Sequence, residues 1–375
     1  DRYKFEVFTN FDITSDIQYG SNLTYTGAAY PLMLDVYEPT GDTEVNRPLM
    51  IIAHGGNFTG GDKTGPDVVT LAQDMAKRGY VVASINYRIG FEGGFTSIDS
   101  VVATETVVRA VHDYRAAIRF FKKDFFENGN TYGIDTSLIF ANGVSAGAIT
   151  SVHVGYMDDL AELPTFIDTT KDGLGGGIEG NSGNPGYVSS GLAGIINIAG
   201  AIRDTSWITS SSTPILSMHG DQDETVPYGS DIIWLLGFWE IMRVDGSSSI
   251  HERANNVSLT NCFHTHFGAG HVPHDGSAAY TDTTETLMCN FMSSFVCNET
   301  LVCGTNDTIV SATSIEESNG NITRLYPNPA KDIITIESNS TIHQVELRGL
   351  LGKVLISNSD INTSKFELNR NTLPS

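Results

Sequence analysis

The chain has 375 residues, of which 40% are hydrophobic, enough for one large globular core and a small second domain. Acidic residues outnumber basic ones by 44 to 22, and the formal net charge of −22 argues against nucleic acid or an anionic membrane as a partner. No apolar run reaches the roughly 18 residues that a membrane-spanning helix requires. Because the sequence begins at Asp1 without a signal peptide, we expect a mature or trimmed product.

Between residues 30 and 300, short apolar runs alternate with longer amphipathic stretches. Continuous apolar runs are typical of strands buried on both faces, and apolar residues at helical spacing indicate helices that cover them. This alternation predicts an α/β fold with a mostly parallel central sheet flanked by helices. Strands are expected at residues 32–37, 49–53, 80–86, 138–141, 194–198, 214–218 and 262–267, and helices at 66–78, 107–125 and 149–160.

Two later stretches interrupt the alternation. Residues 172–191 are rich in glycine, and a loop of this length inside a domain is usually functional or disordered. Residues 304–322 are polar and indicate a linker. We therefore expect a first domain over 1–303 and a small all-β module over 323–375, with short strands at 333–337, 344–348 and 353–356.

The four cysteines, Cys262, Cys289, Cys297 and Cys303, are clustered in the sequence. An even, clustered set favours disulfide bonds and an oxidising compartment outside the cytoplasm. Four cysteines allow three pairings, and the sequence does not choose among them. Four free buried thiols are the alternative, while zinc is disfavoured because no CxxC pair occurs.

The run Gly143-Val144-Ser145-Ala146-Gly147 matches the pattern G-x-S-x-G. It lies between a predicted strand and a predicted helix, which is the context of a nucleophile elbow. Such a turn lifts the serine hydroxyl clear of the sheet, and small residues at 143 and 147 let neighbouring backbone approach closely. We predict Ser145 to be a nucleophile; a chance match in a chain rich in Gly and Ser is the alternative.

A serine hydroxyl needs a base, which is itself oriented by an acid. His271 lies in the glycine-rich run GAGHVP after a predicted strand, where it can reach a nucleophile elbow, and we predict it to be the base. Asp223 lies in the turn DQDETVP after another strand, and we predict it to be the acid, with Asp221 and Glu224 as alternatives.

Further histidines surround this predicted base, namely His264, His266 and His274. A metal site is the alternative interpretation of the cluster. Metal sites of this kind usually include carboxylates, and no supporting carboxylate triad accompanies these histidines. We therefore expect neither a metal nor a cofactor.

A tetrahedral intermediate needs hydrogen-bond donors for its oxyanion. The run His54-Gly55-Gly56-Asn57-Phe58 follows the strand predicted at 49–53, where backbone N–H groups can line such a site. The predicted donors are the N–H groups of Gly56, Asn57 and Ala146, and the predicted substrate-binding residues are Phe58, Trp234 and Trp239. The alternatives are a plain glycine turn and, for the two tryptophans, packing within a helix.

Five motifs in order carry a resemblance: the HGG loop, the Asn86-Tyr87-Arg88 strand end, the GVSAG elbow, HGDQDETVP and GAGHVP. Together they resemble the α/β-hydrolase superfamily, and most closely its carboxylesterase and feruloyl or acetyl-xylan esterase branches. The resemblance covers about residues 25–300 and implies that Ser145, Asp223 and His271 form a catalytic triad. Esterases of this type often carry HGGG, whereas Asn57 here replaces the third glycine. The backbone donor survives this change, and the Asn side chain is expected to narrow the pocket or to add a hydrogen bond to the substrate.

The C-terminal module has its own resemblance. The run Leu325-Tyr326-Pro327-Asn328-Pro329-Ala330, with the strand after it and Gly352-Lys353, resembles the C-terminal sorting domain of type IX secretion in Bacteroidetes. This implies the type IX machinery as a partner and a secreted or cell-surface protein. Such domains usually continue past the equivalent of Leu373-Pro374-Ser375, so we expect a truncated module; a carbohydrate-binding β module is the alternative.

The resemblances imply a secreted serine carboxylesterase that forms an acyl-enzyme on feruloyl or acetyl esters of polysaccharide or on other neutral esters, with aromatic polyesters as a side activity. Substrate selection is expected to lie in residues 172–191 and 232–242. The acidic excess belongs to the first domain and favours uncharged substrates. A serine peptidase on the same fold and an inactive binding protein of esterase fold are the alternatives.

Overall fold

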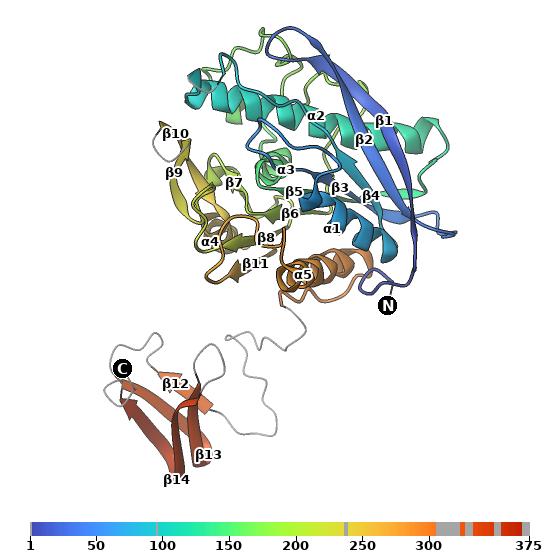
Figure 1. The fold of residues 1–375 in the computed structure, drawn as a ribbon. Helices are drawn as coiled ribbons and strands as arrows, with labels where there is room; N and C mark the ends of the chain where they lie inside the picture. The colour runs from blue at the N-terminus through green and yellow to red at the C-terminus, as the bar shows by residue number, and fades with distance from the viewer. Residues whose placement is uncertain are drawn as a thin grey trace. The chain divides into compact units, whose positions relative to one another are not determined.

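The computed structural model describes residues 2–94, 97–235, 239–304, 323–326, 333–348 and 354–369. It divides into two compact units, Asp1–Asp307 and Thr308–Ser375 (Figure 1). Apart from Gly304, the predicted linker at 304–322 lies outside the described residues. None of the described helices is long and apolar enough to cross a membrane.

An eight-stranded sheet forms the centre of the first unit, in the order β1-β2-β4-β3-β5-β6-β8-β11. The pairs β1–β2 and β2–β4 are antiparallel, and the remaining pairs are parallel. The predicted mostly parallel sheet is therefore confirmed. The strands are Phe11–Leu23 (β1), Ala29–Pro39 (β2), Arg47–Ala53 (β3), Val81–Ile85 (β4), Ile134–Val144 (β5), Gly194–Ile198 (β6), Ile215–Gly220 (β8) and Asn261–His266 (β11).

Helices cover both faces of this sheet, with α2 and α3 on one side and α1 and α5 on the other (Figure 1). Every residue of β3 is buried, and its side chains alternate between the two layers. Leu49 and Ile51 belong to the core cluster that contains α2, whereas Met50 belongs to the cluster that contains α1 and α5. The helices are Pro66–Lys77 (α1), Ser100–Glu127 (α2), Ala146–Tyr156 (α3), Ser247–Asn256 (α4) and Ala278–Val296 (α5).

A hairpin outside the main sheet joins β9 (Ser230–Leu235) to β10 (Trp239–Gly246). Strand β10 also pairs with the short β7 (Ala201–Ile202), so three strands form a separate sheet. The alternative in which the two tryptophans pack within a helix is therefore wrong, because β-branched and aromatic residues in this run favour a strand. Residues 236–238 and the Trp239 side chain lie outside the described residues.

The glycine-rich segment 172–191 runs as turns along α2, held by buried arginines. Arg88 donates to the backbone carbonyl of Gly173 at 3.0 Å and pairs with Asp113 of α2 at 2.8 Å. Arg119, also of α2, donates through Nε to the Gly183 carbonyl at 3.1 Å. These contacts satisfy backbone carbonyls that a glycine-rich loop cannot pair within itself, so the segment is anchored to the domain.

One disulfide, Cys262–Cys303, is present, while Cys289 is a buried free thiol and Cys297 an exposed one. The bond joins β11 to the residue that directly precedes Gly304, the last described residue of the first unit. It therefore closes the stretch that contains α5 and the loop after β11. This pairing is one of the three that the sequence allowed.

We expect Cys303→Ser to lower the free energy of unfolding of the first unit by roughly 4 kcal/mol, the loop-closure value for a separation of this size. The residues joined are 41 apart in sequence. Denaturant unfolding with and without reductant measures the change. The matched control is Cys297→Ser, which removes an exposed free thiol. Equal midpoints for the wild type with and without reductant would contradict the prediction.

The second unit is a three-stranded antiparallel sheet in the order β12-β13-β14. The strands are Thr323–Tyr326 (β12), Ile333–Arg348 (β13) and Val354–Asn369 (β14). The predicted all-β character is confirmed, but the strands predicted at 333–337 and 344–348 are one long strand. Register shifts beyond Glu337 bend the pairing of β13 with β14. Lys353 and the terminal residues 370–375 lie outside the described residues.

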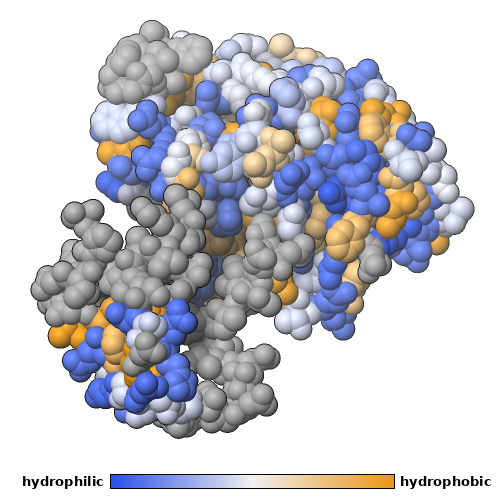
Figure 2. Space-filling model, turned by 60° about the horizontal axis from the view of Figure 1, so that its bottom comes forward, coloured by the Kyte–Doolittle hydropathy of each residue, from blue (hydrophilic) through white to orange (hydrophobic). Residues whose placement is uncertain are grey.

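Hydrophilic side chains surround scattered hydrophobic ones on the face drawn in Figure 2. Such a mixture is typical of folded proteins, whose accessible surfaces keep a large apolar fraction. Among the charged residues of the whole sequence, acidic ones outnumber basic ones by 44 to 22. Exposed apolar side chains do occur, and Phe126 is 64% exposed. Single exposed apolar residues are normal on such surfaces and carry no functional argument by themselves.

Candidate active site

Ser145 lies at the turn between β5 and α3, where its φ is 54° and its ψ is −116°. A positive φ is uncommon for a residue with a side chain and marks a strained turn. Close backbone contacts enforce this turn: a Cβ at Gly143 would lie 2.1 Å from the Gly147 carbonyl oxygen, and one at Gly147 would lie 2.0 Å from the Ala53 carbonyl oxygen. Only glycine fits at both positions.

Three side chains from separate loops meet at this turn. His271 Nε2 lies 2.8 Å from Ser145 Oγ, and His271 Nδ1 lies 2.6 Å from Asp223 Oδ2. The residues follow β5, β8 and β11, whose carboxyl ends lie at one edge of the sheet because these strands are parallel. With a proton on Nδ1 shared with the carboxylate, Nε2 is free to accept the serine proton.

Asp223 makes more hydrogen bonds than the one to His271. Its Oδ1 accepts the backbone N–H groups of Thr225 at 2.8 Å and Val226 at 2.9 Å, and its side chain is fully buried. Burial alone would raise the pKa of this carboxyl, but hydrogen bonds from His219 and His271 lower it well below its usual range. The group is therefore a fixed negative charge beside the imidazole.

His219 is a buried residue of the site that the sequence analysis did not single out. Its Nε2 lies 3.1 Å from Asp223 Oδ2 and 3.1 Å from the Val226 carbonyl, while its Nδ1 lies 2.7 Å from Ser247 Oγ. These partners place the proton on Nε2, which donates to the carbonyl and the carboxylate, and leave Nδ1 to accept from the serine. It therefore bonds the same carboxylate oxygen, Oδ2, that His271 bonds.

The two alternative acids take other positions. Asp221 Oδ1 accepts the backbone N–H of Gly268 at 2.6 Å, and thereby joins the turn after β8 to the loop that carries His271. Glu224 is exposed and lines a cavity beside Ser145. The carboxylate hydrogen-bonded to the imidazole is that of Asp223.

The loop after β3 lies against Ser145. Gly56 and Asn57 have positive φ values of 117° and 53°, and a Cβ at Gly55 would lie 3.3 Å from Ser145 Cβ. Ala146 is the first residue of α3, so its N–H has no partner within the helix. Asn57 and Ala146 line the cavity beside Ser145, whereas Gly56 is not among the lining residues.

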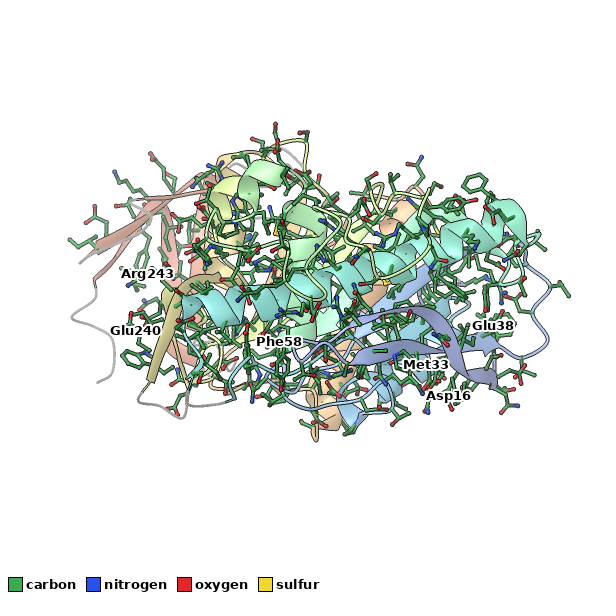
Figure 3. All side chains as sticks on the ribbon, turned by 90° about the horizontal axis from the view of Figure 1, so that it is seen from above. Asp16, Met33, Glu38, Phe58, Glu240 and Arg243 are labelled. Carbon is green, nitrogen blue, oxygen red and sulfur yellow. A yellow bond between two sulfur atoms is a disulfide. The ribbon has the colours of Figure 1, made fainter. Side chains whose placement is uncertain are left out.

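A cavity of about 670 Å³ adjoins Ser145 and is lined mostly by apolar side chains. Of the three predicted substrate-binding residues, Phe58 and Trp234 line it, and the Trp239 side chain lies outside the described residues. In Figure 3, Phe58 lies alongside α2, and Glu240 marks the β9–β10 hairpin. This hairpin supplies one wall, through Ile233, Trp234, Ile241, Met242 and Val244.

No residue of the glycine-rich segment 172–191 lines the cavity. The segment is therefore not part of this cavity's wall, and its role in substrate selection stays a prediction. Its glycines accommodate close approaches to α2 instead: a Cβ at Gly180 would lie 2.3 Å from the His112 ring.

The remaining histidines do not form a metal site. The rings of His264 and His266 lie 4.7 Å apart, and His274 Nε2 donates to the Asp67 carbonyl at 3.0 Å. Desolvation lowers the pKa of each of these three histidines. Within the part of the chain that the structure describes, no group of three His, Cys, Asp or Glu residues could hold a metal ion.

Two family models match the chain. Residues 34–175 match the family BD-FAE, and residues 324–375 match the secretion system C-terminal sorting domain. The sorting domain indicates export by type IX secretion to the cell surface or the extracellular space.

Curated relatives match over shorter stretches. Neuroligin-like protein glit-1 of Caenorhabditis elegans is 32% identical over 128 residues, which are 32% of this chain and 16% of that protein. Gut esterase 1 of Caenorhabditis briggsae is 29% identical over 158 residues, which are 37% of this chain and 27% of that protein. The chain thus spans less than a third of the length of these relatives.

Solved structures resemble the first unit over most of their length. A truncated form of a carbohydrate esterase from gut microbiota has a TM-score of 0.52 at 19% identity, with 78% of this chain and 99% of that chain covered. Thermogutta terrifontis esterase 2 phosphonylated by cyclosarin has a TM-score of 0.50 at 16% identity, with 76% and 95% covered. These likenesses show that the first unit has the α/β-hydrolase fold of esterases.

Proposed function

We propose that this chain, an esterase-type α/β-hydrolase domain joined to a type IX sorting domain, is an exported serine carboxylesterase. The observation that carries the proposal is the continuous hydrogen-bonded chain from Ser145 Oγ through the His271 imidazole to the Asp223 carboxylate. It lies beside a mostly apolar cavity, where an ester can be held away from water.

The reaction follows from this geometry. His271 Nε2 takes the proton of Ser145 Oγ as that oxygen attacks the ester carbonyl, and Asp223 stabilises the imidazolium that forms. The backbone N–H groups of Asn57 and Ala146 donate to the oxyanion of the tetrahedral intermediate. The alkoxide then leaves with the proton from His271. Water, deprotonated by the same imidazole, attacks the acyl-enzyme and releases the acid.

The cavity favours a bulky ester over a minimal one. Its size of about 670 Å³ and its largely apolar lining suit an acyl or alcohol group with an apolar body. Trp234, which is 45% exposed at the hairpin wall, offers a ring on which a sugar or an aromatic group can stack. Feruloyl or acetyl esters of polysaccharide fit these features, with aromatic polyesters as a side activity, and the carbohydrate esterase among the structural neighbours supports the first of these classes.

The experiment that tests the proposal combines turnover with covalent labelling. The full chain is assayed on 4-nitrophenyl acyl esters, methyl ferulate and acetylated xylan, and is then treated with a 4-nitrophenyl phosphonate and mapped by peptide mass spectrometry. We expect ester turnover and one phosphonyl adduct, on Ser145. Absence of both would favour the binding-protein alternative, and cleavage of peptide amides in preference to esters would favour the peptidase alternative.

One acidic residue joins the predicted oxyanion loop to the loop that carries His271. Asp67, in the first turn of α1, accepts the Gly55 N–H through Oδ2 at 2.7 Å, and its backbone carbonyl accepts from His274 at 3.0 Å. The carboxylate therefore fixes the peptide between His54 and Gly55, at the start of the predicted oxyanion loop. A small displacement of donors costs catalysis because the oxyanion site must be preorganised.

We expect Asp67→Ala to lower kcat on the order of tenfold and to leave KM nearly unchanged, because the ground state makes little use of the oxyanion donors. Asp67→Asn keeps an acceptor oxygen and should retain more of the rate. Asp74→Ala is the control on the same helix, since that partly buried carboxylate pairs with Lys77 at 2.6 Å rather than with the catalytic loops. A rise in KM with an unchanged kcat would contradict this positioning role.

A further inference from the structure

Arg203 is a half-buried cation in the wall of the cavity, just after β7. Among the residues that the structure describes, no carboxylate lies within 4.0 Å of its guanidinium, in contrast to the buried Arg88, whose partner Asp113 is 2.8 Å away. The neighbouring Asp204 accepts the backbone N–H of Ser206 at 2.8 Å and acts on Arg203 only through space. A partly buried guanidinium without a direct ion-pair partner is free to form a charge-assisted hydrogen bond with an anionic ligand.

The side chain of Arg203 is nevertheless held in place. Its Nη1 donates to Thr104 Oγ1 at 3.0 Å, and its Cζ lies 5.3 Å from the centre of the Phe166 ring. A guanidinium carries five N–H donors, and this is the one side-chain acceptor that they find among the described residues. The group is therefore preorganised, with donors to spare.

Charged groups do lie near Arg203, since the Asp204 carboxylate favours its charged form through space, but none of the described residues forms an ion pair with it. Its backbone N–H donates to His153 Nε2 at 3.2 Å, and His153 Nδ1 is hydrogen-bonded to the Ile149 carbonyl at 2.7 Å. Burial lowers the pKa of His153 to about 4, so that imidazole is neutral at neutral pH. Glu224 lines the same cavity, but from the turn beside Asp223.

The helix α3 gives the distance from the nucleophile. His153 is two turns along α3 from Ser145, which is about 12 Å at the rise of an α-helix. The backbone N–H of Arg203 contacts α3 at His153. The backbone of Arg203 therefore lies about two helical turns from Ser145, and its side chain lines the cavity that both residues share.

We propose that Arg203 binds a carboxylate of the substrate, so that the preferred esters carry a carboxylate at the end remote from the scissile bond. The inference rests on the proposed esterase function and narrows its substrate class. It departs from the sequence-based expectation of uncharged substrates. The net charge of −22 does repel anions at long range, but salt screens that repulsion beyond about 8–10 Å, whereas a direct guanidinium–carboxylate contact is short and bidentate.

Matched ester pairs test this subsite. The acyl series consists of mono-4-nitrophenyl esters of linear dicarboxylic acids of increasing length, each beside its methyl-capped diester. The alcohol series consists of acetate esters of ω-hydroxy acids, each beside its methyl ester. In one series we expect the free acid to exceed its capped partner in kcat/KM by roughly tenfold or more. The chain length at which this ratio is largest measures the distance from the scissile bond to the guanidinium.

Two variants locate the effect. Arg203→Gln should lose the preference for the free acid, and Arg203→Lys should keep part of it because the charge remains. Arg243→Gln, on the exposed face of β10 (Figure 3), is the control that removes an equal charge outside the cavity, and it should keep the wild-type ratio. Thermal unfolding of each variant checks that the Thr104 and Phe166 contacts are not needed for folding.

The outcomes separate this inference from the proposed function. If the wild type hydrolyses free acids and capped esters equally in both series, the carboxylate subsite is refuted while the esterase function stands. If Arg203→Gln lowers kcat/KM equally for free acids and capped esters, the carboxylate subsite is also refuted, and Arg203 is a structural residue. If no ester of either kind is hydrolysed, the proposed function itself fails.

Discussion

Ser145→Ala is expected to lower kcat for ester hydrolysis by about 10⁶-fold, because the acyl-enzyme can no longer form. The remaining rate, still above that in water, would come from the oxyanion donors and the bound geometry. Alanine has no hydroxyl to occupy the position 2.8 Å from His271 Nε2, but it keeps the Cβ that the elbow already accommodates. The fold should therefore survive, and the dissociation constant of a non-hydrolysed ester analogue should change little.

The measurement is single-turnover hydrolysis of a 4-nitrophenyl ester by purified wild type and variant. Ser151→Ala is the matched control: it lies on the same helix, and its hydroxyl donates to the Ala148 carbonyl at 3.0 Å. That variant should hydrolyse the ester at nearly the wild-type rate. A kcat for Ser145→Ala within about tenfold of the wild type would remove Ser145 from the mechanism.

The parallel sheet was predictable because its strands are continuous apolar runs. In β3, β4 and β6 every residue is buried, and no amphipathic alternation confuses the pattern. Parallel strands also bring their carboxyl ends to one edge. Motifs that follow β5, β8 and β11 could therefore be expected to meet, although they lie far apart in sequence. The distances among Ser145, His271 and Asp223 agree with that expectation.

Other features depend on contacts that no local pattern reveals. The β9–β10 hairpin belongs to a three-stranded sheet because β10 pairs with β7, which is distant in sequence. The helix α2 begins at Ser100, before the expected start at 107, because Asp99 caps it by accepting the backbone N–H groups of Val101 and Val102. Its first turns are rich in β-branched residues, which obscured the helical pattern.

Some polar residues of the site also depend on tertiary contacts that the sequence does not reveal. His219 precedes Asp223 by four residues within the HGDQDETVP motif, but its role depends on how the chain turns after β8. Arg203 belongs to no motif, and only the shape of the cavity assigns it a place near the substrate. The disulfide needed the two Cα atoms at 5.2 Å, a fact of tertiary structure.

Asp223→Asn is expected to lower kcat by about 10⁴-fold while leaving the fold intact, and the hydrogen bonds around the carboxylate give the reason. The backbone N–H groups of Thr225 and Val226 both point at Oδ1, so the amide oxygen of Asn must occupy that position. The amide NH2 then replaces Oδ2 and faces His271 Nδ1, which must accept. The ring proton moves to Nε2, and the imidazole can no longer take the serine proton.

This change should appear in kcat rather than in KM, since substrate binding makes no use of the tautomer. His219→Gln is the informative companion. The Gln side chain can still donate to Asp223 Oδ2, which lies 3.1 Å from His219 Nε2 in the wild type. Because the His271 tautomer stays unchanged, we expect the fall in kcat to be far smaller than for Asp223→Asn. A kcat within about tenfold of wild type for Asp223→Asn would mean that the backbone fixes the imidazole without help from this carboxylate, and the acid would have to be reassigned.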